Sequence, residues 1–202
     1  RTDRIRRSRL RERVVSSGPE MMPKHISMIM DGNRRFAWNR SLQTEAGHSA
    51  GKHKLKEVMR WVLDLEIPYL TVYALSTENL SSRDDTELET LFDLYVSGLE
   101  EISQDPLIHD NKVRVQVVGR KELLPDRVRD AIKNAEDATS QYSDFLFTVC
   151  LAYGGREEIV DAVKEIAEAH ASGTIELDSI DPSTISNRPV SYTHLTLPTR
   201  AV

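Results

Sequence analysis

Residues 24–37 read KHISMIMDGNRRFA, and this stretch decides the fold class. A strand candidate at 24–30, with an apolar run at 26–30, ends directly before Asp31 and Gly32. Three more short runs, at 69–75, 113–118 and 145–151, are rich in β-branched or aromatic residues and are typical of strands. Sequences with helical periodicity separate them. This alternation predicts an α/β fold, in which a parallel central sheet carries helices on both faces.

The predicted helices are recognised by apolar residues that recur at helical spacing. Two shorter stripes occupy residues 128–135 and 159–166. The two longest stripes consist of Leu55, Val58, Met59, Val62 and Leu65, and of Leu88, Leu91, Phe92, Tyr95, Leu99 and Ile102.

Charge and cysteine content exclude several classes of protein. The chain has 202 residues with 27 Lys and Arg, 32 Asp and Glu, and one cysteine. A single cysteine excludes an intrachain disulfide framework and a multi-cysteine zinc site, and a reducing, cytoplasmic location is the default. The acidic composition argues against a nucleic-acid partner. The chain also lacks the run of about 18 apolar residues that a membrane-spanning helix requires.

Composition divides the chain into three segments. Residues 1–18 form a basic arm, with seven arginines in the first 13 positions. We interpret it as a solvated helix, or alternatively as a peripheral contact with an anionic membrane surface. Residues 19–188 form the α/β domain. Residues 189–202 contain no acid and resemble read-through of cloning DNA, so we expect a non-native tail; the alternative is an ordinary Thr-rich segment.

Polar clusters follow three of the four predicted strands, at residues 31–36, 76–79 and 153–156. Because ligands bind at the carboxyl ends of parallel strands, these clusters are expected to share one functional edge of the sheet. The third cluster, YGGR, is the weakest signal, since two glycines after a strand often form only a tight turn.

The first cluster has the components of an anion site. Gly32 allows close backbone approach, a helix starting near Asn33 would present free N–H groups, and Arg34 and Arg35 add charge. Asp31 would repel phosphate unless a divalent cation lies between the carboxylate and a diphosphate. The alternative is that Asp31 and Gly32 form a hairpin turn.

The second cluster, STEN at residues 76–79, offers a hydroxyl, a carboxylate and an amide. Ser82 and Asp85 are spaced like a helix-capping pair, which leaves Ser76, Glu78 and Asn79 without an obvious structural role. Together they suit a proton relay or the orientation of a polar substrate. His48 is a further candidate, in a glycine-containing loop at 47–51 that enters the helix of Leu55.

Four motifs, in this order and spacing, resemble those of the cis-prenyltransferases, the undecaprenyl and dehydrodolichyl diphosphate synthases. They are PKHI and MDGNRRFA within residues 23–37, GHSAG at 47–51, YALSTEN at 73–79 and YGGR at 153–156. The double arginine is more similar to archaeal and eukaryotic members than to bacterial ones. The resemblance implies a transferase that condenses isopentenyl diphosphate with an allylic diphosphate (farnesyl or geranylgeranyl diphosphate) to give a long-chain cis-polyprenyl diphosphate. It also implies Mg²⁺ as cofactor and a homodimer of full-length chains.

The resemblance also implies residue roles. Asp31 would manage Mg²⁺ and the departing diphosphate, and Asn79 would act near the proton-loss step. The growing prenyl chain would enter a tunnel walled by the two long apolar stripes, with Gly98 as a place where space could open; the alternative is that both stripes are ordinary core. The implied substrate-binding residues are Gly32, Asn33, Arg34, Arg35, Phe36, His48, Ser76, Thr77, Glu78 and Arg83.

Some features depart from the family pattern. Leu80 replaces an aromatic residue, Arg83 lies one position late, and Thr44 replaces an arginine for which Arg40 could substitute. The resemblance implies further strands, an arginine-rich isopentenyl diphosphate motif and an acidic Mg²⁺ ligand beyond residue 188, so we expect the chain as written to be inactive. The alternative function is a non-catalytic prenyl-diphosphate-binding subunit that pairs with an active partner.

Overall fold

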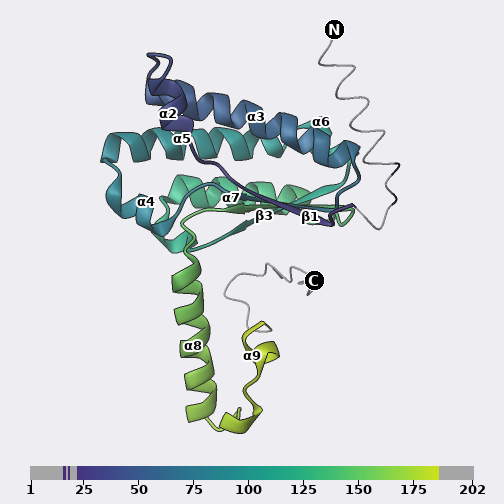
Figure 1. Cartoon of the computed structure of the whole chain (residues 1–202), viewed down its shortest axis with the longest axis vertical. Helices are drawn as coiled ribbons and strands as arrows, with labels where there is room; N and C mark the ends of the chain where they lie inside the picture. The colour runs from purple at the N-terminus through teal and green to yellow at the C-terminus, as the bar shows by residue number, and fades with distance from the viewer. Residues whose placement is uncertain (1–15, 17, 19–21, 187–202) are drawn as a thin grey trace.

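The computed structural model describes residues 16, 18 and 22–186, and Figure 1 shows their arrangement. The elements follow the predicted alternation of strands and helices. In chain order they are β1 (His25–Ile29), α2 (Asn33–Trp38), α3 (Thr44–Asp64), β2 (Tyr69–Tyr73), α4 (Thr77–Ser82), α5 (Asp85–Ile102), α6 (Pro106–Asp110), β3 (Val113–Val118), η2 (Lys121–Leu123), α7 (Asp126–Thr139), β4 (Phe145–Cys150), α8 (Gly155–Ala171), η3 (Leu177–Ser179) and α9 (Pro182–Ser186).

The four strands form one parallel sheet in the order β1-β2-β4-β3, which confirms the predicted fold class. β3 has the predicted bounds, and the other three strands end one or two residues early. Residues paired across the four strands point to the same face of the sheet, so their side chains form rows across it. One such row is Ile26, Leu70, Phe147 and Val115, and the last three of these are almost completely buried.

Helices cover this apolar face. The first core cluster joins α5 and α7 to the sheet through Phe92, Leu99 and Val128, and the second joins α3 and α6 through Met59, Val62 and Ile108. In Figure 1 α3 and α5 run side by side above the strands. The face therefore carries a layer of helices, as expected for an α/β fold.

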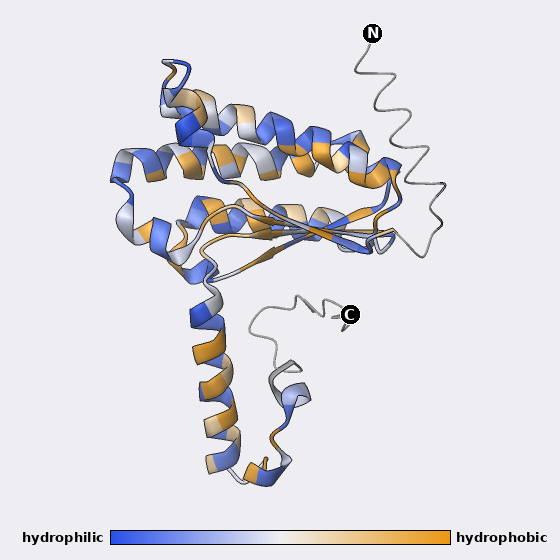
Figure 2. Ribbon diagram, in the orientation of Figure 1, coloured by the Kyte–Doolittle hydropathy of each residue, from blue (hydrophilic) through white to orange (hydrophobic). Residues whose placement is uncertain are grey.

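The opposite face has a different character. Its central row, Ser27, Thr71, Thr148 and Gln116, is entirely polar, so an apolar helix would gain little by packing along it. α8 starts at the carboxyl edge of the sheet and runs away from the strands (Figure 1). The expectation of helices along both faces is thus met along one face. Apolar side chains on α8 are exposed to solvent, among them Ile159 at 64% exposure and Val163 at 56%. Figure 2 shows the orange, hydrophobic segments along this helix.

The predictions for the basic arm, residues 1–13, and for the tail, residues 189–202, lie outside the described residues. Among the residues that are described, no helix combines the length and the apolar character needed to cross a bilayer.

Candidate active site

The polar clusters after β1, β2 and β4 meet at the carboxyl edge of the sheet, as the sequence predicted. The Met30 N–H donates to the carbonyl of Tyr73 at 2.9 Å, so the chain leaving β1 follows the end of β2. Ser76 forms an isolated parallel bridge with Tyr153, which joins the STEN segment to the YGGR segment. The topological rule for open parallel sheets therefore placed the three clusters at the correct edge of the sheet.

Gly32 forms the turn between β1 and α2. Its φ of +87° lies in the left-handed region that favours glycine, and it is the N-cap of α2. The Gly32 N–H donates to the Asp31 carboxylate at 2.6 Å, and Arg35 pairs with the same carboxylate at 3.1 Å. A helix follows directly, so the hairpin alternative is wrong. α2 has only six residues, so Arg34 and Arg35, rather than a long helix dipole, supply most of the positive charge.

Two glycines of α3 allow α2 to lie against it closely. A Cβ atom on Gly47 would lie 2.2 Å from the Asn33 carbonyl oxygen, and one on Gly51 would lie 2.7 Å from Asn33 Oδ1. α3 begins at Thr44, so both glycines and His48 lie inside the helix. The prediction that His48 sits in a loop is therefore wrong. The glycines serve close helix packing, and this packing positions Asn33 and His48 side by side at the site.

Glu87 in α5 is the acidic residue around which the basic groups of the site gather, and the sequence analysis missed it. Its Oε1 accepts a hydrogen bond from Arg83 Nη1 at 2.8 Å and lies 3.5 Å from His48 Nε2 and 3.8 Å from Arg34 Nε. The Glu87 side chain is only 12% exposed. One buried carboxylate thus holds together three basic groups that come from α2, α3 and the α4–α5 turn.

Two of these basic groups retain unused hydrogen-bonding capacity. Among the described residues, His48 Nε2 and Arg83 Nε are buried and have no hydrogen-bond partner; His48 Nε2 lies 3.5 Å from Glu87 Oε1. Burial lowers the pKa of His48; the neighbouring Glu87 carboxylate opposes this shift, and the charge of Arg83 adds to it. Buried donors without partners are expensive, so both groups are suited to a ligand that brings its own acceptors.

A polar cavity of about 610 Å³ lies over this arrangement. It contains both the arginine pair of α2 and the two groups with unused donors, so most of its charge is positive. Its wall residues are Met30, Asp31, Gly32, Asn33, Arg34, Arg35, Trp38, Leu42, Gln43, Thr44, His48 and Arg83.

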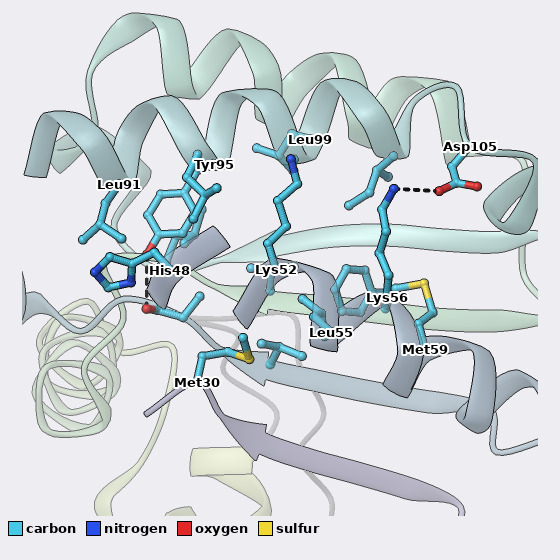
Figure 3. Close-up of a pocket in the computed structure, with 18 of the residues that line it drawn as sticks. Met30, His48, Lys52, Leu55, Lys56, Met59, Leu91, Tyr95, Leu99 and Asp105 are labelled. Atoms are coloured by element: carbon cyan, nitrogen blue, oxygen red, sulfur yellow. Dashed lines mark hydrogen bonds and ion pairs between the residues drawn. The ribbon is translucent and has the colours of Figure 1, made fainter. Parts of the chain in front are cut away.

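An apolar cavity of about 140 Å³ adjoins the polar one, between α3, α5 and the sheet. Residues of both predicted stripes line it, among them Leu55, Met59, Leu91 and Leu99, so part of each stripe is a cavity wall as well as core. Figure 3 shows His48 at one end of the cavity and Lys56 with Asp105 at the other. The residues shared by the two cavities are Met30, Asn33, His48 and Arg83.

The STEN residues lie apart from both cavities. Ser76 is the N-cap of α4, because its hydroxyl accepts from the Asn79 N–H at 3.0 Å. The inference that Ser76 has no structural role is therefore wrong. Thr77 donates to Glu157 at 3.1 Å, Glu78 is exposed, and neither these residues nor Asn79 line the two cavities.

The predicted cap of α5 was also misplaced. The N-cap is Asp84, whose carboxylate accepts from the Glu87 N–H at 2.9 Å, whereas Ser82 is the last residue of α4. Phe36, another predicted ligand, packs under the Arg40 guanidinium, 4.0 Å from its ring centre, and is absent from both cavity walls.

A family model of prenyltransferases, described as undecaprenyl diphosphate synthase, matches residues 29–198. The chain belongs to this family. A relative of this chain from Methanopyrus kandleri is 48% identical over 176 residues, and one from Pyrococcus horikoshii is 47% identical over 167 residues. Both are named tritrans,polycis-undecaprenyl-diphosphate synthase (geranylgeranyl-diphosphate specific).

These alignments cover 87% and 83% of this chain, but 64% and 62% of the two relatives. The chain thus spans less than two thirds of the length of either. Among solved structures, lavandulyl diphosphate synthase from Lavandula x intermedia, in complex with dimethylallyl diphosphate, has a TM-score of 0.77 and 31% identity. That match covers 82% of this chain and 70% of the lavender enzyme.

Proposed function

We propose that the protein condenses isopentenyl diphosphate with an allylic diphosphate to form a long-chain cis-polyprenyl diphosphate. One observation supports this most strongly: a cation-lined polar cavity and an apolar cavity share Met30, Asn33, His48 and Arg83. An allylic diphosphate has the same division, with a charged head joined to an apolar tail. A ligand with only one of these parts would leave half of the site unused.

The described residues of the site would first bind the allylic diphosphate and orient it. Arg34, Arg35 and Arg83 would hold the diphosphate through charge-assisted hydrogen bonds, and the buried donor of His48 would gain an acceptor. Glu87 would fix the orientation of Arg83 and His48. Because diphosphate departs as an anion when the new carbon–carbon bond forms, donors already in place would stabilise the charge that develops on it.

Asp31 fits a divalent cation that is held mainly by substrate. It is the sole carboxylate in the wall of the polar cavity, and no cluster of three metal-binding side chains occurs among the described residues. Mg²⁺ is commonly bound by one or two carboxylates together with substrate phosphates. When bound, Mg²⁺ would supply neutralisation of phosphate charge, and Asp31 would be its protein ligand in this part of the chain.

For the allylic substrate we propose geranylgeranyl diphosphate, because the archaeal relatives above are named for it. Asn79, Ser76, Thr77 and Glu78 would then serve the isopentenyl diphosphate side, outside the two cavities. Assembly as a homodimer, a cytoplasmic location and contact with a membrane surface stay part of this proposal.

Equilibrium binding tests the head-and-tail site directly. The ligands are a non-cleavable geranylgeranyl thiolodiphosphate, inorganic diphosphate as the head alone, and geranylgeraniol as the tail alone. The complete ligand should bind at least tenfold more tightly than either part, since each part loses the contacts of one cavity. Equal affinity for geranylgeraniol and for the complete geranylgeranyl ligand would contradict the proposal.

Arg83→Gln gives the matched variant test. It should weaken binding of the complete ligand by about 10-fold or more, because a charge-assisted hydrogen bond is lost, and should leave binding of the alcohol unchanged. The control is Arg60→Gln on α3, an exposed residue outside both cavities. Identical results for the two variants would remove Arg83 from the head site.

The relatives are named as synthases, which favours catalysis over the alternative of a binding subunit. Because the chain as written is expected to be inactive, the test uses a chain with the C-terminal part of the family restored. Incubation with isopentenyl and geranylgeranyl diphosphates and Mg²⁺, followed by analysis of extracted lipids, then separates the two. Elongated products support the transferase, whereas tight binding without any product supports the subunit.

A further inference from the structure

A row of ion pairs crosses from α3 to α5 along the apolar cavity, and its Lys56–Asp105 pair lies at the end far from His48. Lys52 Nζ lies 2.6 Å from Glu101 Oε1 and donates to Ser97 Oγ at 3.2 Å. Lys56 Nζ lies 2.8 Å from Glu101 Oε2 and 3.3 Å from Asp105 Oδ2. We call Lys52, Lys56, Glu101 and Asp105 the ion bridge. Its lysines belong to α3, and its acids to the end of α5 and the turn that follows.

The ion bridge is part of the cavity wall. Lys52, Lys56 and Asp105 line the apolar cavity, and their side chains are 22%, 35% and 22% exposed. Figure 3 shows Lys52 extending from α3 towards α5, beside Leu99, with the Lys56–Asp105 pair further from His48. The lysine stems thus cover apolar surface while their ammonium groups form the ion pairs. A Cβ on Gly98 would lie 3.7 Å from Lys52 Cε, an ordinary van der Waals contact, so the position of Lys52 does not depend on this glycine.

His48, Lys52 and Lys56 follow one another at intervals of four residues along α3. At about 1.5 Å per residue, successive members are about 6 Å apart along the helix. A prenyl tail that extends from a head group near His48 would therefore pass Lys52 first and Lys56 next. The ion bridge meets the tail at two successive depths.

The cavity is too small for a long tail in its present form. At about 140 Å³, it is comparable with an engineered protein cavity of about 150 Å³ that holds one benzene molecule. One side of the cavity is the paired sheet, which cannot widen without loss of strand hydrogen bonds. The opposite side is α3 and α5, so a longer tail must part these two helices, and the ion bridge ties them together.

We propose that the ion bridge determines the length of prenyl tail that the protein accommodates, because longer tails fit only when it opens. This inference rests on the proposed function, and it adds residues that decide specificity rather than residues that bind the head. Both partners are well suited to remain charged near neutral pH. The hydrogen bond with Glu101 raises the pKa of Lys56, and the hydrogen bonds with Lys52 and Lys56 lower the pKa of Glu101.

The test compares binding of non-cleavable prenyl thiolodiphosphates of increasing length, from geranyl to geranylgeranyl and longer. In the wild-type chain, affinity should rise with tail length and then stop rising once the tail reaches the ion bridge. The variant Lys52→Met with Lys56→Met keeps the apolar stems and removes both charges. It should bind the tails beyond this limit at least tenfold more tightly than wild type, with unchanged affinity for inorganic diphosphate.

Two variants serve as controls. Lys54→Met removes an exposed lysine of the same helix, which pairs with Glu57 and does not line the cavity, and it should keep the wild-type length profile. Lys52→Arg with Lys56→Arg preserves the charges and should also keep that profile.

The outcomes separate this inference from the proposed function. If affinity depends on tail length but the double methionine variant matches Lys54→Met, the ion bridge does not decide length and this inference alone is overturned. If no prenyl diphosphate binds, or if binding ignores tail length in every variant, the proposed function fails and takes this inference with it.

Discussion

Glu87→Gln should destabilise the protein far more than an equivalent change two residues away. The carboxylate is 12% exposed and accepts a 2.8 Å hydrogen bond from Arg83, which is 14% exposed. Glutamine retains a hydrogen-bond acceptor but loses the charge that faces Arg83, His48 and Arg34. Loss of a charge-assisted hydrogen bond costs about 2 kcal/mol, and the low exposure of Arg83 and His48 places this change at that value or above it, whereas Arg34 is largely exposed and adds little.

Urea unfolding followed by circular dichroism measures this effect. With a slope of about 2 kcal/mol per molar urea, the midpoint should fall by about 1 M. The matched control is Glu89→Gln on the same helix, whose carboxylate lies 2.6 Å from Arg127 Nη2 in an exposed pair. Exposed ion pairs contribute little, so its midpoint should stay near that of wild type. Equal midpoints for the two variants would refute the assignment of Glu87 as the organising group.

Inorganic diphosphate adds a second readout to the same comparison. In Glu87→Gln the three basic groups have one fewer counter-charge, so diphosphate should raise the urea midpoint of this variant more than that of wild type. A structural role unrelated to the anion site would give equal increases in the two proteins.

Gly47→Ala should lower the free energy of unfolding, measured in urea, by about 1–3 kcal/mol, because the new Cβ would lie 2.2 Å from the backbone oxygen of Asn33. Gly155→Ala is the control and should not lower it, because a Cβ there would have no atom within 4 Å. Equal urea midpoints for the two variants would mean that α2 can move away from α3 at no cost in stability, which would contradict the prediction. Burial lowers the pKa of His48, so between this lowered value and about 6.5 the unfolded chain binds more protons than the folded one. The free energy of unfolding should therefore fall on acidification below about pH 6.5. His48→Gln should make this fall less steep, whereas His53→Gln, at an exposed position, should leave it unchanged. The same dependence of stability on pH in the wild type and both variants would contradict the prediction.

The sequence predicted the sheet well because strand signals are local. The run at residues 113–118 is bounded by a turn before it and by Gly119 after it, and β3 has those same bounds. The carboxyl-edge rule then placed the segments of Asp31, Ser76 and Tyr153 at one edge of the sheet without any knowledge of side-chain contacts.

The helix around His48 was harder to predict because its glycines have a long-range cause. Glycine in a helix costs about 1 kcal/mol relative to alanine, so a segment with Gly47 and Gly51 reads as a loop. In the structure both glycines face Asn33 of α2, and the close contact offsets that cost. Only the pairing of α2 with α3, which the sequence does not display, reveals the reason.

Glu87 was missed for a similar reason. The sequence shows its spacing of four residues from Arg83, which is a common helix-surface pattern worth little on its own. Its importance comes from Arg34 and His48, which reach it from two other helices. Ser76 illustrates the opposite error, since a local capping role was overlooked in favour of a functional one.

A crystal structure of the chain with geranylgeranyl thiolodiphosphate tests the central claim most directly. We expect the phosphates among Gly32, Arg34 and Arg83, with an acceptor near His48 Nε2, and the tail between α3 and α5 beside Leu55 and Leu99. A diphosphate bound outside the polar cavity, or a prenyl tail that makes no contact with α3 and α5, would contradict the account.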